Sequence, residues 1–195
     1  FCDECFPGYG YAYDNNIQTG KCAPCPDHCS SCTDNSSFCD ENSCDSGYGH
    51  VLNEKGEKTG KCGPCPSNCI SCRENNSRCD SSSCFPGYGL EIGSDKEPTG
   101  KCKACPINCI SCSDNADNCS SCQSDYGFVI GDDGFRTGKC GPCPSNCRSN
   151  YGCSQDSSYC SDCEDNFGLA TRNDGLPTQI CEPCPSNCRL CSKNS

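Results

Sequence analysis

The spacing of thirty cysteines constrains this 195-residue chain more than any other feature. Leu, Ile, Val and Phe together contribute only 21 residues. Burial of so few large apolar side chains cannot offset the roughly 1–2 kcal/mol of chain entropy that each ordered residue costs. An ordinary hydrophobic core is therefore excluded, and the chain must be disordered, bound to metal clusters or cross-linked by disulfides.

Disulfides explain the cysteines better than metal does. The spacing Cys-x2-Cys, as in Cys22 and Cys25, also occurs in zinc sites. However, Cys-x-Cys pairs are absent, and His28 and His50 are the only histidines, so mixed Cys/His sites cannot be general. We therefore expect oxidised cystines in a secreted protein, with no metal and no other cofactor.

The cysteines fall into five groups of six, which define five repeats. The first cysteines of successive groups are 37, 40, 40 and 41 residues apart. The predicted repeats are residues 1–36, 37–76, 77–116, 117–157 and 158–195. Within each repeat the pattern is C-x2/4-C-x16/17-C-x2-C-x3-C-x2-C, except that five residues separate the last two cysteines of repeat 4. A period of this length indicates stacked units that contact only their neighbours.

Each long gap between cysteines predicts a β-hairpin. An aromatic-Gly pair falls four residues after the second cysteine of every repeat, and in repeat 4 residues 127–130 and 135–137 form the expected arms around a turn at 131–134. Turn residues recur at 53–56 in repeat 2 and at 173–175 in repeat 5. We expect each aromatic to pack on a neighbouring cystine, and the short Cys-Pro segments to hold no more than one helical turn. The predicted fold is a small disulfide-rich protein, an elongated rod of five cystine-laddered repeats with short β-hairpins and little other regular secondary structure.

The pattern resembles the furin-like repeat, the cysteine-rich module of growth-factor receptor ectodomains. The resemblance covers the whole chain and is carried by Cys25-x3-Cys29-x2-Cys32-x6-Cys39, followed by Cys44, a Gly-Tyr-Gly segment, a hairpin and Cys62. The run CPSNCISC, from Cys65 to Cys72, is also similar to repeats of protist surface proteins, especially those of ciliates. Other cystine-ladder families, such as EGF-like modules, space their cysteines comparably, and spacing alone does not prove connectivity.

The resemblance implies one disulfide "hook" and a two-disulfide "knot" in each repeat. The hooks would be Cys5–Cys22, Cys44–Cys62, Cys84–Cys102, Cys122–Cys140 and Cys163–Cys181. The knots would be Cys25–Cys32 with Cys29–Cys39, Cys65–Cys72 with Cys69–Cys79, Cys105–Cys112 with Cys109–Cys119, and Cys143–Cys153 with Cys147–Cys160, followed by Cys184–Cys191. Each hook closes a loop worth roughly 3 kcal/mol in the chain-entropy model. Five such loops would replace a hydrophobic core.

This pairing leaves Cys2 and Cys188 outside the intrachain bonds. Cys2 would need a cysteine from a preceding repeat, and Cys188 one from a following repeat. Two interpretations stay open: the chain is a piece of a longer array or its end cysteines pair differently, or chains join head to tail through Cys188 and Cys2. The second contact is heterologous and would build a filament.

No catalytic constellation is present, and we expect no enzymatic activity. His28 and His50 lie in polar sequence without a nucleophile motif, and we expect both to be exposed. The formal net charge of −11 disfavours nucleic acid as a partner. No apolar stretch approaches the length of a membrane helix. We therefore expect a secreted protein of the extracellular space or cell surface.

Two modification sites and one binding loop are also predicted. Asn35 and Asn75 begin glycosylation sequons at matching positions of successive repeats, whereas the sequon at Asn118 has a structural cysteine in its middle position. Repeat 4 diverges at 148–152, where Arg148, Asn150 and Tyr151 are candidate ligand-binding residues.

The leading functional prediction is a structural one. The chain is expected to be a subunit of a surface coat or extracellular filament whose partner is another copy of itself, with glycans attached. The alternative is a ligand-binding or adhesive receptor-like ectodomain fragment, which the furin-like resemblance also implies.

Overall fold

The computed structural model describes residues 1–148, 153–172, 176–189, 191 and 193–194. By its internal contacts the chain divides into two units, Phe1–Lys103 and Ala104–Ser195. The described residues form β-strands, turns and bends without any helix, so none of them belongs to a helix that spans a membrane. The prediction of a disulfide-rich fold with little regular structure is confirmed.

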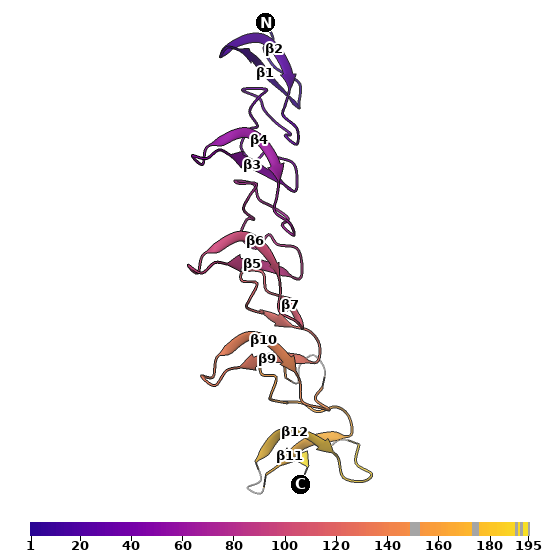
Figure 1. Cartoon of the computed structure of the whole chain (residues 1–195). Helices are drawn as coiled ribbons and strands as arrows, with labels where there is room; N and C mark the ends of the chain where they lie inside the picture. The colour runs from indigo at the N-terminus through magenta and orange to yellow at the C-terminus, as the bar shows by residue number, and fades with distance from the viewer. Residues whose placement is uncertain (149–152, 173–175, 190, 192, 195) are drawn as a thin grey trace. The chain divides into compact units, whose positions relative to one another are not determined.

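Each repeat contributes one antiparallel hairpin (Figure 1). In the first unit the hairpins are formed by β1 (Tyr9–Asp14) and β2 (Ile17–Pro24), β3 (Tyr48–Leu52) and β4 (Lys58–Pro64), and β5 (Tyr88–Ile92) and β6 (Pro98–Ala104). In the second unit they are formed by β9 (Tyr126–Ile130) and β10 (Arg136–Pro142), and β11 (Phe167–Thr171) and β12 (Pro177–Pro183). The short strands β7 (Cys109–Ser111) and β8 (Ser121–Cys122) pair with each other, and β13 (Lys193–Asn194) adds to β11 in parallel.

The turns agree with the turn chemistry of the sequence. In repeat 4 the N–H of Gly131 donates to Phe135 O at 2.8 Å, and the N–H of Gly134 donates to Gly131 O at 2.9 Å. In repeat 2 the side chain of Asn53 accepts the N–H groups of Lys55 and Glu57. The second arm of the repeat 4 hairpin extends to Pro142, five residues beyond the predicted end at 137. The predicted turn at 173–175 lies outside the described residues.

Fourteen disulfides hold the fold, and their connectivity matches the one that the furin-like resemblance implies. The match includes Cys143–Cys153, where the extra residues of repeat 4 lie. We call the bond from the fifth cysteine of one repeat to the first cysteine of the next a joint. The joints are Cys29–Cys39, Cys69–Cys79, Cys109–Cys119 and Cys147–Cys160.

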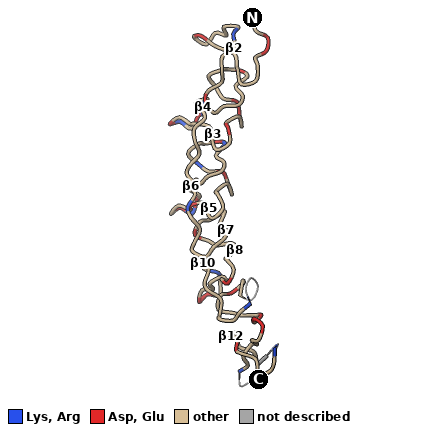
Figure 2. Tube along the Cα trace, turned by 90° about the vertical axis from the view of Figure 1, so that its right-hand side faces the viewer, with Lys and Arg blue, Asp and Glu red and all other residues tan. Residues whose placement is uncertain are grey.

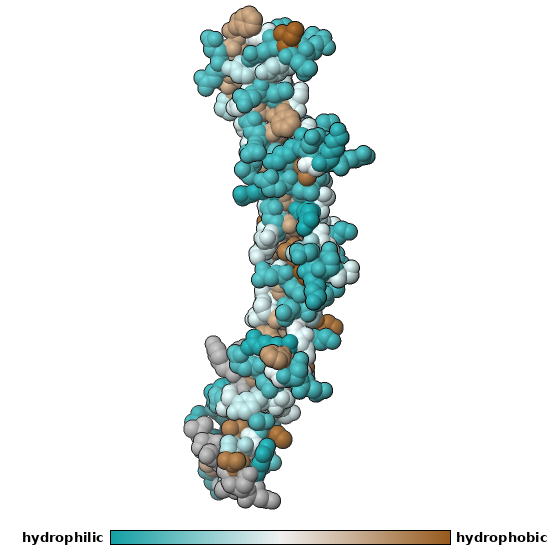
Figure 3. Space-filling model, turned by 90° about the vertical axis from the view of Figure 1, so that its left-hand side faces the viewer, coloured by the Kyte–Doolittle hydropathy of each residue, from teal (hydrophilic) through white to brown (hydrophobic). Residues whose placement is uncertain are grey.

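Cystine sulfur takes the place of an aliphatic core. In repeats 2 and 3, for example, the buried residue Leu90 packs with Cys69, Cys72, Cys79 and Cys84. The face shown in Figure 3 is mainly hydrophilic, with separate hydrophobic positions. Figure 2 shows acidic residues spread along both units. Cross-linking and burial of sulfur therefore allow the fold to form with few large apolar side chains.

The glycine of each aromatic-Gly pair is buried, and in repeats 1, 2, 4 and 5 a larger residue would not fit there. A Cβ built on Gly49 would lie on the carbonyl oxygen of Cys72 and 2.8 Å from its Sγ, and Gly10 faces Cys32 in the same way. The aromatic partner varies more: Tyr88 packs against the cystine cluster of its repeat, whereas Tyr9 is 47% exposed. In repeats 1, 2, 4 and 5 the glycine, more than the aromatic, therefore lets the hairpin lie on its knot.

Candidate functional site: the cysteine joint

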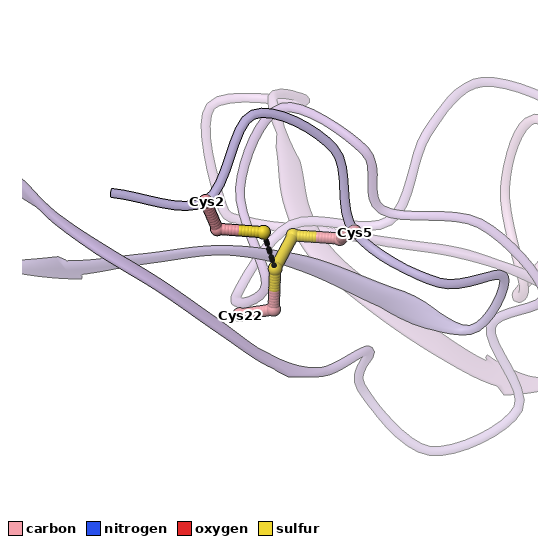
Figure 4. A group of neighbouring side chains, drawn as sticks. All are labelled: Cys2, Cys5 and Cys22. Carbon is pink, nitrogen blue, oxygen red and sulfur yellow. Dashed lines mark hydrogen bonds between the residues drawn. A yellow bond between two sulfur atoms is a disulfide. The ribbon is translucent and has the colours of Figure 1, made fainter.

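Three sulfur atoms form a group in repeat 1 (Figure 4). Cys5 and Cys22 form the hook disulfide, and the Sγ of Cys2 lies 3.2 Å from the Sγ of Cys22. Cys2 carries a thiol and is half-buried. The site therefore consists of a thiol held against a cystine.

The first cysteines of later repeats lie in the same place. The Sγ of Cys119 is 3.3 Å from that of Cys140, and the Sγ of Cys160 is 3.3 Å from that of Cys181. Each of these first cysteines is bonded to the knot of the preceding repeat. Cys2 therefore occupies the position of a joint cysteine.

The backbone fixes Cys2 in the same way as the other joint cysteines. The N–H of Cys2 donates to Gly20 O at 3.0 Å, as the N–H of Cys39 donates to Gly60 O at 2.8 Å. The corresponding bonds from Cys79 and Cys119 are 2.6 and 2.8 Å long. The thiol of Cys2 also donates to Glu4 O at 3.0 Å, and the Sγ of Cys160 lies 3.1 Å from Asp162 O. The acceptor half of a joint is thus already formed at Cys2.

The knot half of a joint has its own constant geometry. The N–H of the fifth cysteine donates to the proline carbonyl three residues earlier, at 3.2 Å for Cys29 and 3.0 Å for Cys188. The residue before the fifth cysteine has a positive φ in every repeat: His28, Asn68, Asn108, Asn146 and Asn187. Asparagine tolerates this left-handed conformation better than most residues. Repeat 5 therefore presents Cys188 on the same backbone as the bonded fifth cysteines.

A short backbone pairing accompanies each joint. Isolated antiparallel bridges connect Cys29 with Cys44, Cys69 with Cys84 and Cys147 with Cys163, and β7 and β8 supply the corresponding contact in the remaining joint. These bridges place the residue after the fifth cysteine opposite the residue before the hook cysteine. Ile70 N–H accordingly donates to Ser83 O at 2.7 Å.

The donor chemistry of the sulfur groups fits disulfides better than a metal ion. A metal ligand must be a thiolate, and a sulfur in a disulfide is not one. In the Cys2 group only the Cys2 sulfur can become a thiolate while the Cys5–Cys22 bond is formed. In the corresponding group of Cys29, Cys39 and Cys62 every sulfur belongs to a disulfide.

The acidic residue that follows a joint cysteine strengthens two of the joints. Asp40 accepts hydrogen bonds from Ser31 Oγ at 2.7 Å and from Thr33 N at 2.9 Å. Burial acts to raise the pKa of Asp40, but these hydrogen bonds outweigh it and hold the pKa below its ordinary value. Asp80 receives the same kind of bond from Ser71. In sequence, Asp3 occupies the corresponding position after Cys2.

The matched positions of the sequons have a structural explanation. At this place in four repeats a side-chain oxygen accepts the N–H two residues later. The acceptor and donor residues are Asn35 and Ser37, Asn75 and Ser77, Asn115 and Asp117, and Asp156 and Ser158. The turn therefore explains the recurrence without a glycan. Asn35 and Asn75 are half-buried, and Asn118 is exposed beside the bonded Cys119.

The candidate binding loop is only partly described. Asn150 and Tyr151 lie outside the described residues. Arg148 has a role at the joint between repeats 4 and 5: its Nε lies 2.9 Å from an oxygen of Asp162, and its Nη2 lies 3.2 Å from one of Asp165. The sequence drew attention to Arg148 as a ligand contact but not to this ion pair.

The expectation that both histidines are exposed is wrong for His50. His28 is exposed and stacks on Tyr48, with ring centroids 3.8 Å apart. His50 is 0% exposed, and neither ring nitrogen has a hydrogen-bond partner among the described residues. Burial lowers the pKa of His50, and the charge of Lys58 lowers it further. His50 follows an aromatic-Gly pair at the position that Leu90 and Phe128 occupy in later repeats, so its place in the repeat was the missed signal.

Comparisons with known proteins name no relative. No family model, no curated protein and no solved structure matches the chain.

Proposed function

We propose that this chain is a non-enzymatic structural protein of the extracellular surface, a subunit of a coat or filament in which copies join head to tail. The observation that carries the proposal is the placement of Cys2. Its sulfur contact and backbone hydrogen bond are those of cysteines that are bonded to a preceding knot. A bond from Cys188 of one copy to Cys2 of the next would repeat the internal joint.

The extracellular setting rests on the cystines. Fourteen disulfides fit an extracellular or secreted protein, because such bonds persist in oxidising compartments. We also propose that the repeats are related to furin-like repeats, which the hook-and-knot pairing supports. The cell-surface location and the glycans at Asn35 and Asn75 belong to the same proposal. A mass decrease after glycosidase treatment of native material would support the glycans, and an unchanged mass would reject them.

Bond formation between copies needs an oxidant. The thiols of Cys188 and Cys2 together lose two protons and two electrons, and an organic disulfide takes them up and becomes two thiols. Electrophoresis of native material without reductant tests the proposal. A ladder of multiples of one chain that collapses to one band on reduction supports it. A monomer with fifteen intrachain disulfides would refute it.

A further inference from the structure

The joint between repeats 4 and 5 carries an ion pair at a defined place. Arg148 follows the fifth cysteine of repeat 4, and Asp162 precedes the hook cysteine of repeat 5. The Arg148 N–H donates to Asp162 O at 2.8 Å, and the guanidinium Nε lies 2.9 Å from the Asp162 carboxylate. The same two residues therefore meet through both backbone and side chain.

The other internal joints carry no charge at these two places. The residues after the fifth cysteine are Ser30, Ile70 and Ile110, and those before the hook cysteine are Ser43, Ser83 and Ser121. The backbone contact is nevertheless the same, since Ser30 N–H donates to Ser43 O at 2.8 Å. The ion pair is thus an addition to a geometry that forms without it.

The same pair of charges is present on the two surfaces that a head-to-tail contact would bring together. Arg189 follows Cys188 in the run CPSNCR, which is identical to the run that ends at Arg148. Glu4 precedes the hook cysteine Cys5, and the two-residue spacing between Cys2 and Cys5 equals the spacing between Cys160 and Cys163. Repeat 1 therefore has the acceptor spacing of repeat 5, and repeat 5 shares with repeat 4 the run up to the residue after the fifth cysteine, although two residues instead of five separate its last two cysteines.

We propose that a second copy of this chain docks its repeat 5 knot on repeat 1, and that an ion pair between Arg189 and Glu4 selects this contact. The inference rests on the proposed head-to-tail function and names its recognition element. The Arg189 N–H would donate to Glu4 O, the carbonyl that already accepts the Cys2 thiol. The Phe6 N–H would donate to Asn187 O, as Glu164 N–H donates to Asn146 O at 2.9 Å.

The Arg189 side chain is available for this role. It is 87% exposed, and its ion pair with Asp165, at 3.9 Å, is long and in contact with solvent, so the side chain can exchange Asp165 for Glu4. In the internal joint the side chains of Arg148 and Asp162 are 46% and 58% exposed, so the pair stays in contact with solvent. An ion pair that is this exposed changes the association equilibrium between two copies by a small factor. It acts mainly on the choice of partner and on the rate of encounter. The covalent step remains the oxidation of Cys188 and Cys2 by an organic disulfide.

Two singly blocked forms of the full chain test the inference. The variant Cys2→Ser can contribute only Cys188, and the variant Cys188→Ser can contribute only Cys2. Mixed in a buffer of oxidised and reduced glutathione, they should form one cross-linked dimer, measured by electrophoresis without reductant and identified by mass spectrometry. If this dimer does not form, the head-to-tail function and the inference both fail.

Charge reversal separates the inference from the proposed function. Glu4→Arg in the acceptor form, or Arg189→Glu in the knot form, should lower the dimer yield about 3- to 10-fold, because repulsion replaces attraction. Combining the two reversals should restore the dimer yield to within about twofold of the yield of the original pair. In 1 M NaCl the yields of the original, singly reversed and doubly reversed pairs should become equal. Glu54→Arg, in the repeat 2 turn, controls for net charge and should have no effect. A dimer that forms equally well with either single reversal, or fails to recover with both, overturns the ion pair while leaving the head-to-tail function standing.

Discussion

Replacing Gly49 by alanine is expected to separate the repeat 2 hairpin from its knot. The new methyl group would lie on the Cys72 carbonyl oxygen and 2.8 Å from its Sγ, where real Cβ contacts essentially never fall below 3.0 Å. Neither atom belongs to a flexible chain end, because the Cys65–Cys72 disulfide fixes both. The hairpin must therefore move away from the knot.

The expected magnitude follows from the contacts that this movement breaks. His50 N–H donates to Arg73 O at 3.1 Å, and Asn76 N–H donates to His50 O at 2.9 Å. Overpacking costs about 1–3 kcal/mol, and each lost hydrogen bond costs about 0.5–1.5 kcal/mol. The local free energy of opening should thus fall by about 2–6 kcal/mol, which lowers amide protection by a factor of about 30 or more.

Hydrogen–deuterium exchange of β3 and β4, with all disulfides intact, measures this loss. Gly47→Ala is the matched control, since a Cβ there meets nothing within 4 Å, although its φ of +81° disfavours alanine. That strain should cost only about 1 kcal/mol. If Gly49→Ala lowers protection of the hairpin no more than Gly47→Ala does, the steric argument is wrong.

Three further predictions concern pH and cross-linking. Because burial lowers the pKa of His50, stability should be lost as the pH falls below the unfolded value of about 6.5, and His50→Leu should weaken this dependence in urea unfolding between pH 7.5 and 5.5. If His50→Leu leaves the pH dependence of the unfolding free energy unchanged, the role assigned to His50 is wrong. Hydrogen bonds hold the pKa of Asp40 below its ordinary value, so Asp40→Asn should lower the free energy of unfolding by about 1–2 kcal/mol at pH 7. This loss should shrink as the pH falls below 3.8, because the Asp40 carboxylate then becomes protonated in the unfolded and later in the folded chain. Equal losses at pH 7 and pH 2 would contradict this prediction. The double variant Cys44→Ala with Cys62→Ala removes a hook disulfide that joins residues 18 apart in sequence. The free energy of unfolding, measured in urea, should fall by about 3 kcal/mol because the unfolded chain gains entropy. A loss below about 1 kcal/mol would exclude this entropic explanation of the hook's contribution.

The sequence predicted the hairpins because turn chemistry and cysteine spacing are local signals. The turn at 131–134 and the arms around it needed no knowledge of distant contacts. The disulfide connectivity was different, since spacing permits many pairings and only the resemblance to a known module selected one. Gly49 shows the remaining limit: its recurrence was visible, but the reason is a contact with Cys72 that only the folded chain displays.

The burial of His50 and the ion pair of Arg148 were missed because each residue was considered in its local sequence. Polar neighbours suggested that His50 is exposed, although its repeat position is that of Leu90, which is buried. The divergence after Arg148 predicted a ligand site, which stays a prediction, and it drew no attention to Asp162, the ion-pair partner of Arg148 in the next repeat. For burial, the equivalent position in another repeat is therefore a better guide than the adjacent residues, as His50 and Leu90 show.

The polarity of the joint determines what kind of assembly the proposed contact would make. Every joint combines two different surfaces, the fifth-cysteine side of one knot and the first-cysteine side of the next hairpin. A contact between copies that uses Cys188 on one side and Cys2 on the other cannot have two-fold symmetry, because the surfaces are not the same. After each addition, such a heterologous contact leaves the repeat 1 surface exposed at one end and the repeat 5 knot exposed at the other. Copies can therefore keep adding as an open filament, unless the rotation between them closes a ring. The proposed Arg189–Glu4 pair has the same polarity, which would disfavour Cys2–Cys2 and Cys188–Cys188 dimers through like-charge contacts.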